Sequence, residues 1–287
     1  MALKVGRQAE RTVLKALRHE GPVRLQKLFW PEGASPAHAI LLHPPGAMAG
    51  GDTLELDVQA EEGSGLVITT PGAGKWYRSR SSALQRMRFR VANGACIEWM
   101  PQETLVHDGA RMDARSTWEL AAGARAAALD ILVFGRRESG ERCKELALTL
   151  ASRIEIAGRL AYLDRVLLGT SANFPGVDLH LKGAAVLGEH HVSGLLWAYA
   201  PEFGASPDGA SRFTPLHDAL ETIFATLEAL GGESLHLGAS CLPCGLVLVR
   251  AVGSDTEPLR KSLQQAWSLL RPLIRAKAAC VPRIWNT

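Results

Sequence analysis

One recurring pattern, from Leu41 to about Leu168, limits the folds open to this chain of 287 residues. A run of apolar or alternating residues meets a glycine-containing turn, and a second such run follows. Short runs of this kind, bounded by turn residues, are typical of β-strands. The turns recur at intervals of about 30 residues, and they contain Gly63, Gly94, Gly123 and Gly158. The pattern predicts a mainly β fold, a layered or superhelical body built of successive hairpins that bury one another's apolar faces.

Alternation within the runs indicates which face of each strand is buried. In residues 54–59, leucine and valine alternate with glutamate, aspartate and glutamine. In residues 86–91, methionine, phenylalanine and valine alternate with three arginines. Successive strand residues point to opposite faces of a sheet. Each run therefore predicts a strand with one apolar face and one charged face.

The last third of the chain follows a different pattern. Apolar residues recur at helical spacing from Pro215 to Leu230 and from Pro258 to about Ile274. Between them, Leu246 to Val252 is a strand-like run. We expect a β-rich body over residues 1–213 and a small C-terminal α/β unit with two helices over 214–287, packed together as one integrated domain.

Composition narrows the class of protein. The formal net charge of +3 gives no reason to expect nucleic acid as a partner. No apolar run reaches the roughly 18 residues that a membrane-spanning helix needs, and the first residues contain no signal-peptide core. Five scattered cysteines suit a reducing compartment better than a disulfide framework. We expect a soluble cytoplasmic protein that binds neither nucleic acid nor a membrane.

A stiff loop follows the first apolar run of the repeat. It begins at His43 with two prolines, which fix φ, and continues through glycines that adopt backbone angles closed to other residues. It ends at Asp52. Such a loop holds one shape, and the side chains of His43 and Asp52 at its ends can bind a metal or a partner.

The next strand ends at a glycine-rich turn that resembles a phosphate loop only in part. Thr69 stands where that loop needs glycine, and Trp76 stands where it needs Ser or Thr. The turn is instead expected to display a basic and aromatic group at the surface. Exposed aromatic and Arg side chains are typical anchors of protein interfaces. The residues of this expected interface are Lys75, Trp76, Tyr77 and Arg78.

Two aspartates stand inside apolar runs, Asp130 in AAALDILVF and Asp164 in LAYLDRVLL. A buried carboxylate is costly unless it is paired, hydrogen-bonded or bound to a metal. Arg165 adjoins Asp164 but would face the other side of a strand. Either each aspartate pairs with an Arg or a backbone donor, or at least one handles a metal ion. Carboxylates with an occasional His suit transient handling of a divalent cation.

No catalytic motif accompanies these residues. The chain has no G-x-S-x-G or H-E-x-x-H sequence. Cys241 and Cys244 supply only half a zinc site, and the adjacent His190 and His191 would point to opposite faces of a strand. We therefore expect no enzyme activity.

Several longer segments carry a family resemblance. In order, they are GPVRLQKLFWPEG, HPPGAMAGGD, TTPGAGKWYRS, PQETLVHDGAR, LDILVFGRRESGE and LLRP…PRIWNT. Together they resemble the urease accessory protein UreD, called UreH in some bacteria. The resemblance runs along nearly the whole chain and is weakest from Gly169 to Arg212. Ala47 stands where the family commonly has a second glycine.

The resemblance implies a non-enzymatic urease maturation factor with a β-rich superhelical fold. Such proteins bind urease apoprotein and UreF, which recruits the GTPase UreG, and they assist nickel delivery to the dinickel site of urease. An internal acidic path for nickel has been proposed for the family, and Asp52, Asp130 and Asp164 match acidic positions of its pattern. With His43, these residues form our candidate path, in which nickel is transient cargo.

Two other functions stay open from the residues alone. One is a metal-dependent hydrolase that uses His43 and the aspartates. The other is a structural adaptor that binds no metal.

Overall fold

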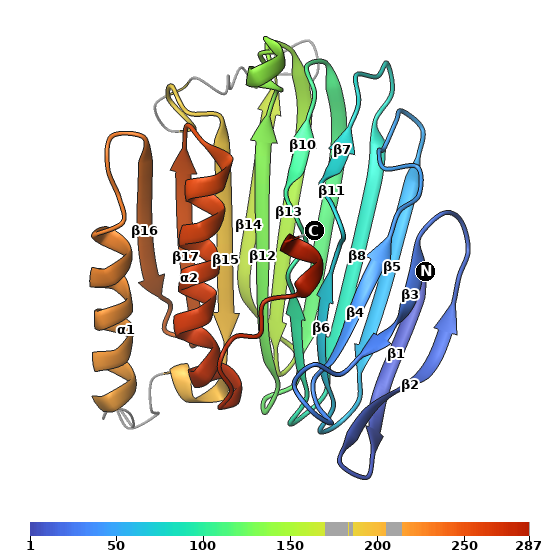
Figure 1. Cartoon of the computed structure of the whole chain (residues 1–287), viewed down its shortest axis with the longest axis vertical. Coiled ribbons are helices and arrows are strands. Elements are labelled where there is room, and N and C mark those ends of the chain that lie inside the picture. Colours follow the sequence, from blue (N-terminus) through green and yellow to red (C-terminus); the bar gives the residue numbers. More distant parts are fainter. Residues whose placement is uncertain (170–182, 184–185, 205–213, 287) are drawn as a thin grey trace.

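The alternating runs form strands, and the strands form two sheets that pack face to face (Figure 1). The computed structural model describes residues 1–169, 183, 186–204 and 214–286. In spatial order, sheet A consists of β14 (Arg159–Gly169), β13 (Leu146–Ile156), β11 (Ala110–Leu120), β8 (Ala83–Val91), β5 (Thr53–Ala60), β1 (Ala2–Gln8) and β2 (Arg11–Arg18). Sheet B consists of β16 (Leu235–Cys241), β17 (Leu246–Gly253), β15 (Val192–Tyr199), β12 (Arg125–Phe134), β9 (Cys96–Trp99), β6 (Gly65–Thr69), β4 (Ala37–Leu42) and β3 (Arg24–Phe29), with β10 (Thr104–Val106) and β7 (Gly74–Trp76) paired beside β12.

The chain winds between the two sheets, which confirms the mainly β, superhelical body. Its repeating unit differs from the expected hairpin. β5, β8 and β11 lie in sheet A, whereas the strands that follow them, β6, β9 and β12, lie in sheet B. Their neighbours within each sheet are parallel. Of the four predicted turns, only the one at Gly158 joins two strands that pair with each other, β13 and β14.

The other three glycine turns are corners of the superhelix, stacked on one another. The Gly63 amide donates to the Asn93 carbonyl over 3.4 Å, and the Gly94 amide donates to the Gly123 carbonyl over 2.9 Å. Gly63 and Gly94 have φ of 67° and 65°, in the left-handed region that favours glycine. Successive coils are thus joined through the backbone of the corners as well as through their strands.

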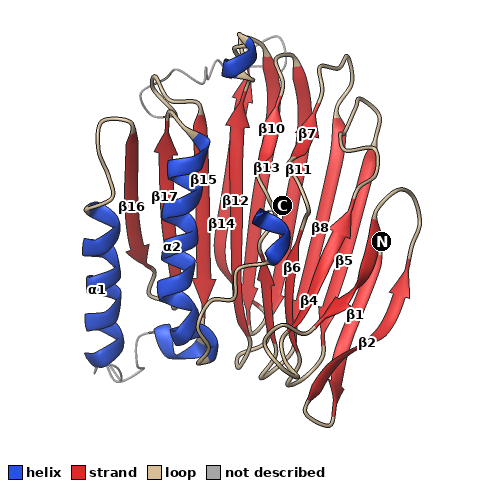
Figure 2. Ribbon diagram, in the orientation of Figure 1, coloured by secondary structure: helices blue, strands red, loops and turns tan. Residues whose placement is uncertain are grey.

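The C-terminal elements confirm the helical and strand predictions. Helices α1 (Thr214–Glu228) and α2 (Thr256–Arg275) lie on the face of sheet B that points away from sheet A (Figure 2). β17 covers the strand predicted at Leu246–Val252 and pairs along its length with β15. The buried apolar residues of α2 recur at helical spacing: Leu259, Leu263, Ala266, Trp267, Leu270 and Ile274. Within the described residues, no helix is long and apolar enough to span a membrane.

Short 3₁₀ helices complete the fold at Arg137–Ser139, Pro201–Phe203 and Arg283–Asn286. The last of them returns to sheet B, where the buried Trp285 donates its indole N–H to the hydroxyl of Thr69 over 2.7 Å. The C-terminal segment is therefore packed against the body.

The space between the sheets contains two apolar clusters. In one, Phe89 stacks on Trp118 with ring centroids 3.9 Å apart, and Trp197 of the opposite sheet meets Trp118 edge-on at 4.7 Å. The other gathers around Trp76 and Phe134. Polar side chains lie between the two clusters, and they include two of the predicted site residues.

Candidate functional site

A layer of polar side chains separates the two apolar clusters between the sheets. Asp130 follows Ala126 and Ala128 on the inward face of β12, and its register partner across two strands of sheet B is Arg250. On the facing sheet A, the side chains in register are Ser116, Ser152 and Asp164. The hydroxyl of Ser116 donates to that of Ser152 over 3.1 Å. We call Asp130, Arg250, Ser116, Ser152 and Asp164 the polar layer.

Asp130 has an unusual environment within this layer. The residue is exposed at the surface, yet the surrounding protein desolvates the carboxyl and raises its pKa to about 6. The Trp99 indole N–H offsets part of this pKa rise, although it forms no hydrogen bond of ordinary length. Desolvation, with no ion pair from the described residues to offset it, therefore opposes the negative charge of Asp130.

Asp164 is held by partners that join the two sheets. Its Oδ2 accepts a hydrogen bond of 2.9 Å from the Tyr162 hydroxyl and one of 3.2 Å from the Arg250 guanidinium. Arg250 also donates to the Tyr162 hydroxyl over 2.7 Å. Of the two readings that the sequence left open, pairing with an Arg therefore holds for Asp164. Asp130 has no such ion pair within the described part of the chain.

The proline-glycine loop brings His43 and Asp52 close together. The Asp52 carboxylate accepts the Ala49 amide over 2.8 Å, which closes the loop, and Gly46 and Gly51 have φ of 70° and 88°. Partial burial lowers the pKa of His43, and the negative charge of Asp52 opposes that shift. Asp52 itself is exposed, and the loop from His43 to Asp52 lies between β4 and β5, outside the strands that contribute the polar layer.

The four candidate residues do not form one coordination site. Among the described residues, the only group of three ligand-bearing side chains close enough to hold an ion is Glu32, His38 and Cys280. Asp130 and Asp164 lie on opposite walls of the inter-sheet space, and His43 and Asp52 lie in a loop outside it. Chemically, the arrangement offers separate single carboxylates, which suits a passing cation better than a stored one.

The expected surface display of the basic-aromatic turn is wrong for Trp76. Its side chain is 3% exposed and packs beside Met48 in the second inter-sheet cluster, whereas Tyr77 is 45% exposed. The reason is the alternation of β7, which turns residue 76 inward and its neighbours outward. Arg78 is exposed and forms an ion pair with Asp108. Lys75, Tyr77 and Arg78 remain available as interface residues.

Trp76→Ala is therefore expected to act on stability. Removing a buried Trp should lower the free energy of unfolding by about 3–5 kcal/mol. The matched control Tyr77→Ala removes an exposed ring and should change it by less than about 1 kcal/mol. Urea unfolding followed by circular dichroism measures both, and equal effects of the two substitutions would refute this assignment.

Sequence reasoning missed a buried ionic cluster under the end of α2. Arg271 and Glu98 are fully buried. Arg271 donates to both oxygens of Glu32 over 2.8 and 2.7 Å, and to both oxygens of Glu98 over 2.9 and 3.2 Å. Arg275 and the Trp267 indole also donate to Glu98, over 3.0 and 2.8 Å. These bonds fix α2 to β9 of sheet B through Glu98 and to the segment after β3 through Glu32.

Comparison with known sequences identifies the family of this chain. A family model described as UreD urease accessory protein matches residues 1–286. The urease accessory protein UreD of Dechloromonas aromatica is 39% identical over 286 residues, covering 99% of this chain and 93% of the relative. That of Alkalilimnicola ehrlichii is 37% identical over 288 residues, covering 100% and 90%. Matches of this length span the loop, the polar layer and the C-terminal cluster alike, and the chain belongs to the UreD family of urease accessory proteins.

Proposed function

We propose that this chain is a cytoplasmic scaffold for urease maturation that binds urease apoprotein and UreF, and through UreF the GTPase UreG. In this role it assists delivery of nickel to the dinickel site of urease, with nickel as cargo. Urease accessory proteins are maturation factors rather than enzymes, in agreement with the expectation of no enzyme activity. The family supports the maturation role, and the polar layer between the sheets supports the passage of an ion.

The observation that carries the passage of nickel is the environment of Asp130. A carboxyl with a pKa near 6 is mostly ionised at neutral pH, and in a desolvated setting where no described residue forms an ion pair with it, its charge can be balanced by a divalent cation. Across the layer, Arg250 already neutralises Asp164, so an ion that reaches Asp164 must compete with a guanidinium. Competition of this kind keeps binding weak, which transfer requires.

In this proposal, the His43–Asp52 loop provides a nickel-binding site at the surface, and the turn around Tyr77 provides a surface for a partner protein. His43 and Asp52 lie close together at the surface, with a neutral imidazole favoured by partial burial. A neutral imidazole and a carboxylate can ligate nickel together. Lys75, Tyr77 and Arg78 then form part of the surface that meets a partner protein.

Co-expression of urease with the Asp164→Ala variant tests the proposed nickel path. The variant should assemble with urease and UreF as wild type does, while the purified urease contains less nickel and has lower activity. Asp57→Ala is the matched control, because Asp57 pairs with Arg90 on the outer face of sheet A. Full nickel loading with both Asp164→Ala and Asp130→Ala would rule out the path, whereas failure of the wild-type chain to bind either protein would rule out the scaffold.

A further inference from the structure

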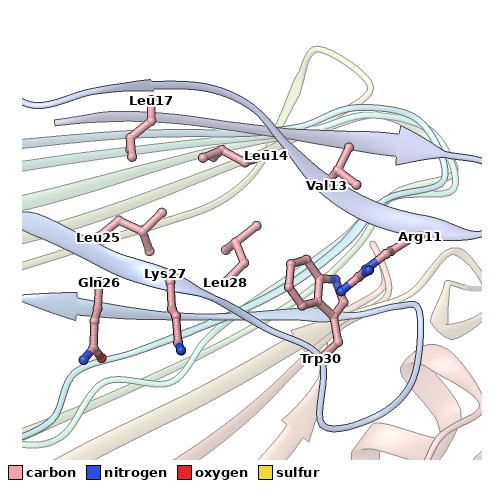
Figure 3. Close-up of a pocket in the computed structure, with 9 residues that line it drawn as sticks. All are labelled: Arg11, Val13, Leu14, Leu17, Leu25, Gln26, Lys27, Leu28 and Trp30. Carbon is pink, nitrogen blue, oxygen red and sulfur yellow. The ribbon is translucent and has the colours of Figure 1, made fainter.

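The two sheets end in exposed edges at the side of the molecule farthest from α1 (Figure 1). β2 is the last strand of sheet A, and β3 is the last strand of sheet B. A groove of about 500 Å³ lies between them. Apolar side chains of both strands face one another across it, as Figure 3 shows. They are Val13, Leu14 and Leu17 from β2 and Leu25, Leu28 and the adjacent Trp30 from the β3 side.

The groove is closed at one end and open along its length. At the closed end, the Trp30 indole donates to the Thr12 carbonyl over 2.9 Å, and the Arg11 guanidinium stacks over the Trp30 ring at 3.8 Å. Farther along, Leu14 is 41% exposed and Leu17 is 38% exposed. Exposed leucines on an edge strand favour association with another chain, and folded proteins usually protect such edges.

Charge on the two edge strands has one sign. Every ionisable residue of β2 and β3 is basic: Arg11, Lys15, Arg18, Arg24 and Lys27. Arg18 pairs with Glu20 just beyond the strand. Of these basic residues, Arg11 and Lys27 line the groove, whereas the side chain of Lys15 lies beside Gly6 of β1. The groove thus combines an apolar floor with two basic side chains, Arg11 and Lys27.

We propose that this groove binds an acidic amphipathic segment of a protein partner in the urease assembly, an inference that rests on the proposed function. Apolar side chains of the segment cover Leu14 and Leu17, and its carboxylates meet Arg11 and Lys27. A second copy of the chain is the poorer occupant, because two basic grooves would face each other and repel. The free backbone edges of β2 and β3 also suit pairing with an extended segment.

Binding measurements with purified urease apoprotein and purified UreF test the groove. Leu14→Glu/Leu17→Glu should raise the Kd for the partner that uses the groove at least about tenfold, because it removes the apolar contact and adds like charge. The matched control is Leu160→Glu/Leu163→Glu, two exposed leucines of β14 at the far edge of sheet A, and it should leave the Kd unchanged. Equal urea midpoints of the variants and wild type establish that folding is intact.

Zero-length carbodiimide cross-linking then identifies the occupant. Lys27 should cross-link to an aspartate or glutamate of one amphipathic segment in the partner. Wild-type affinity of the Leu14→Glu/Leu17→Glu variant would overturn the proposal, as would a dimer of the chain alone that this variant abolishes. If the wild-type chain binds neither protein, the proposed scaffold fails and this inference fails with it.

Discussion

Replacing Arg271 by Ala is expected to lower the free energy of unfolding by roughly 3–5 kcal/mol. Arg271 is fully buried and holds two carboxylates, Glu32 and Glu98. Without it, Glu98 keeps Arg275 but loses its closest charged partner, and Glu32 keeps only His38 among its side-chain partners. A buried charge left without its counterion is among the most costly defects in a protein interior. Native domains have total stabilities of about 5–15 kcal/mol, so the variant should be close to unfolding.

Urea unfolding of Arg271→Ala beside two other variants measures this effect. Arg153→Ala breaks the largely exposed pair with Glu155 and should cost less than about 1 kcal/mol. A double variant, Glu32→Gln/Arg271→Met, removes opposite charges together, keeps the Glu98–Arg275 pair and should recover part of the loss. A stability of Arg271→Ala within about 1 kcal/mol of wild type would contradict the prediction.

The same ion pair predicts an acid limb in the stability curve. Despite the desolvation that opposes it, hydrogen bonds from His38 and Arg271 lower the pKa of Glu32 from 4.5 to about 2. The folded state therefore binds fewer protons than the unfolded state between pH 2 and 4.5. The stabilisation is fully present above pH 4.5 and is lost as the pH falls toward 2. In Arg271→Ala, this limb should be flatter than in wild type.

The secondary structure of this chain could be predicted from local pattern, but the pairing of its strands could not. Alternation located the strand at 54–59, and helical spacing located α1 and α2. A glycine turn at Gly94 has the same local signature whether its flanking strands pair with each other or part into two sheets. Whether the two strands pair or enter different sheets depends on contacts with coils about 30 residues away. The sequence of one segment does not contain this information. The inward position of Trp76 follows from the same long-range pairing, through Val106 of β10.

Some of the polar residues between the sheets can be predicted from sequence, because a charged residue inside an apolar run needs an explanation. This criterion identified Asp130 and Asp164. It would also have identified Glu98 in ACIEWM, although not its partner Arg271, which lies 173 residues away. Likewise, nothing near Asp164 indicates Arg250, which reaches it from the opposite sheet. Carboxylates that need a partner can be recognised locally, whereas the partners are supplied by the fold.

Asp130→Asn is expected to separate stability from function. The enclosed site raises the pKa of Asp130 from 3.8 to about 6, so the folded state binds more protons than the unfolded state between these values. Stability falls as the pH rises from 3.8 through 6 and stays lowered above 6. Asn has nearly the same shape and cannot ionise, so the variant should be at least as stable as wild type at pH 8. Higher stability of Asp130→Asn at pH 8 would mean that the charge of Asp130 serves function rather than folding.

Urease activation should respond in the opposite direction. An amide is a poorer ligand for nickel than a carboxylate is. The nickel loading of urease co-expressed with the variant should therefore fall by about tenfold or more. The measurements are thermal unfolding of the isolated chain at pH 5 and pH 8, and the nickel content of urease purified from the co-expression. Asp57→Asn, on the outer face of sheet A, is the control that should change neither. Loss of stability together with activation would make Asp130 a structural residue. Unchanged activation would remove it from the nickel path, because the polar layer passes an ion only if its one unpaired carboxylate takes part.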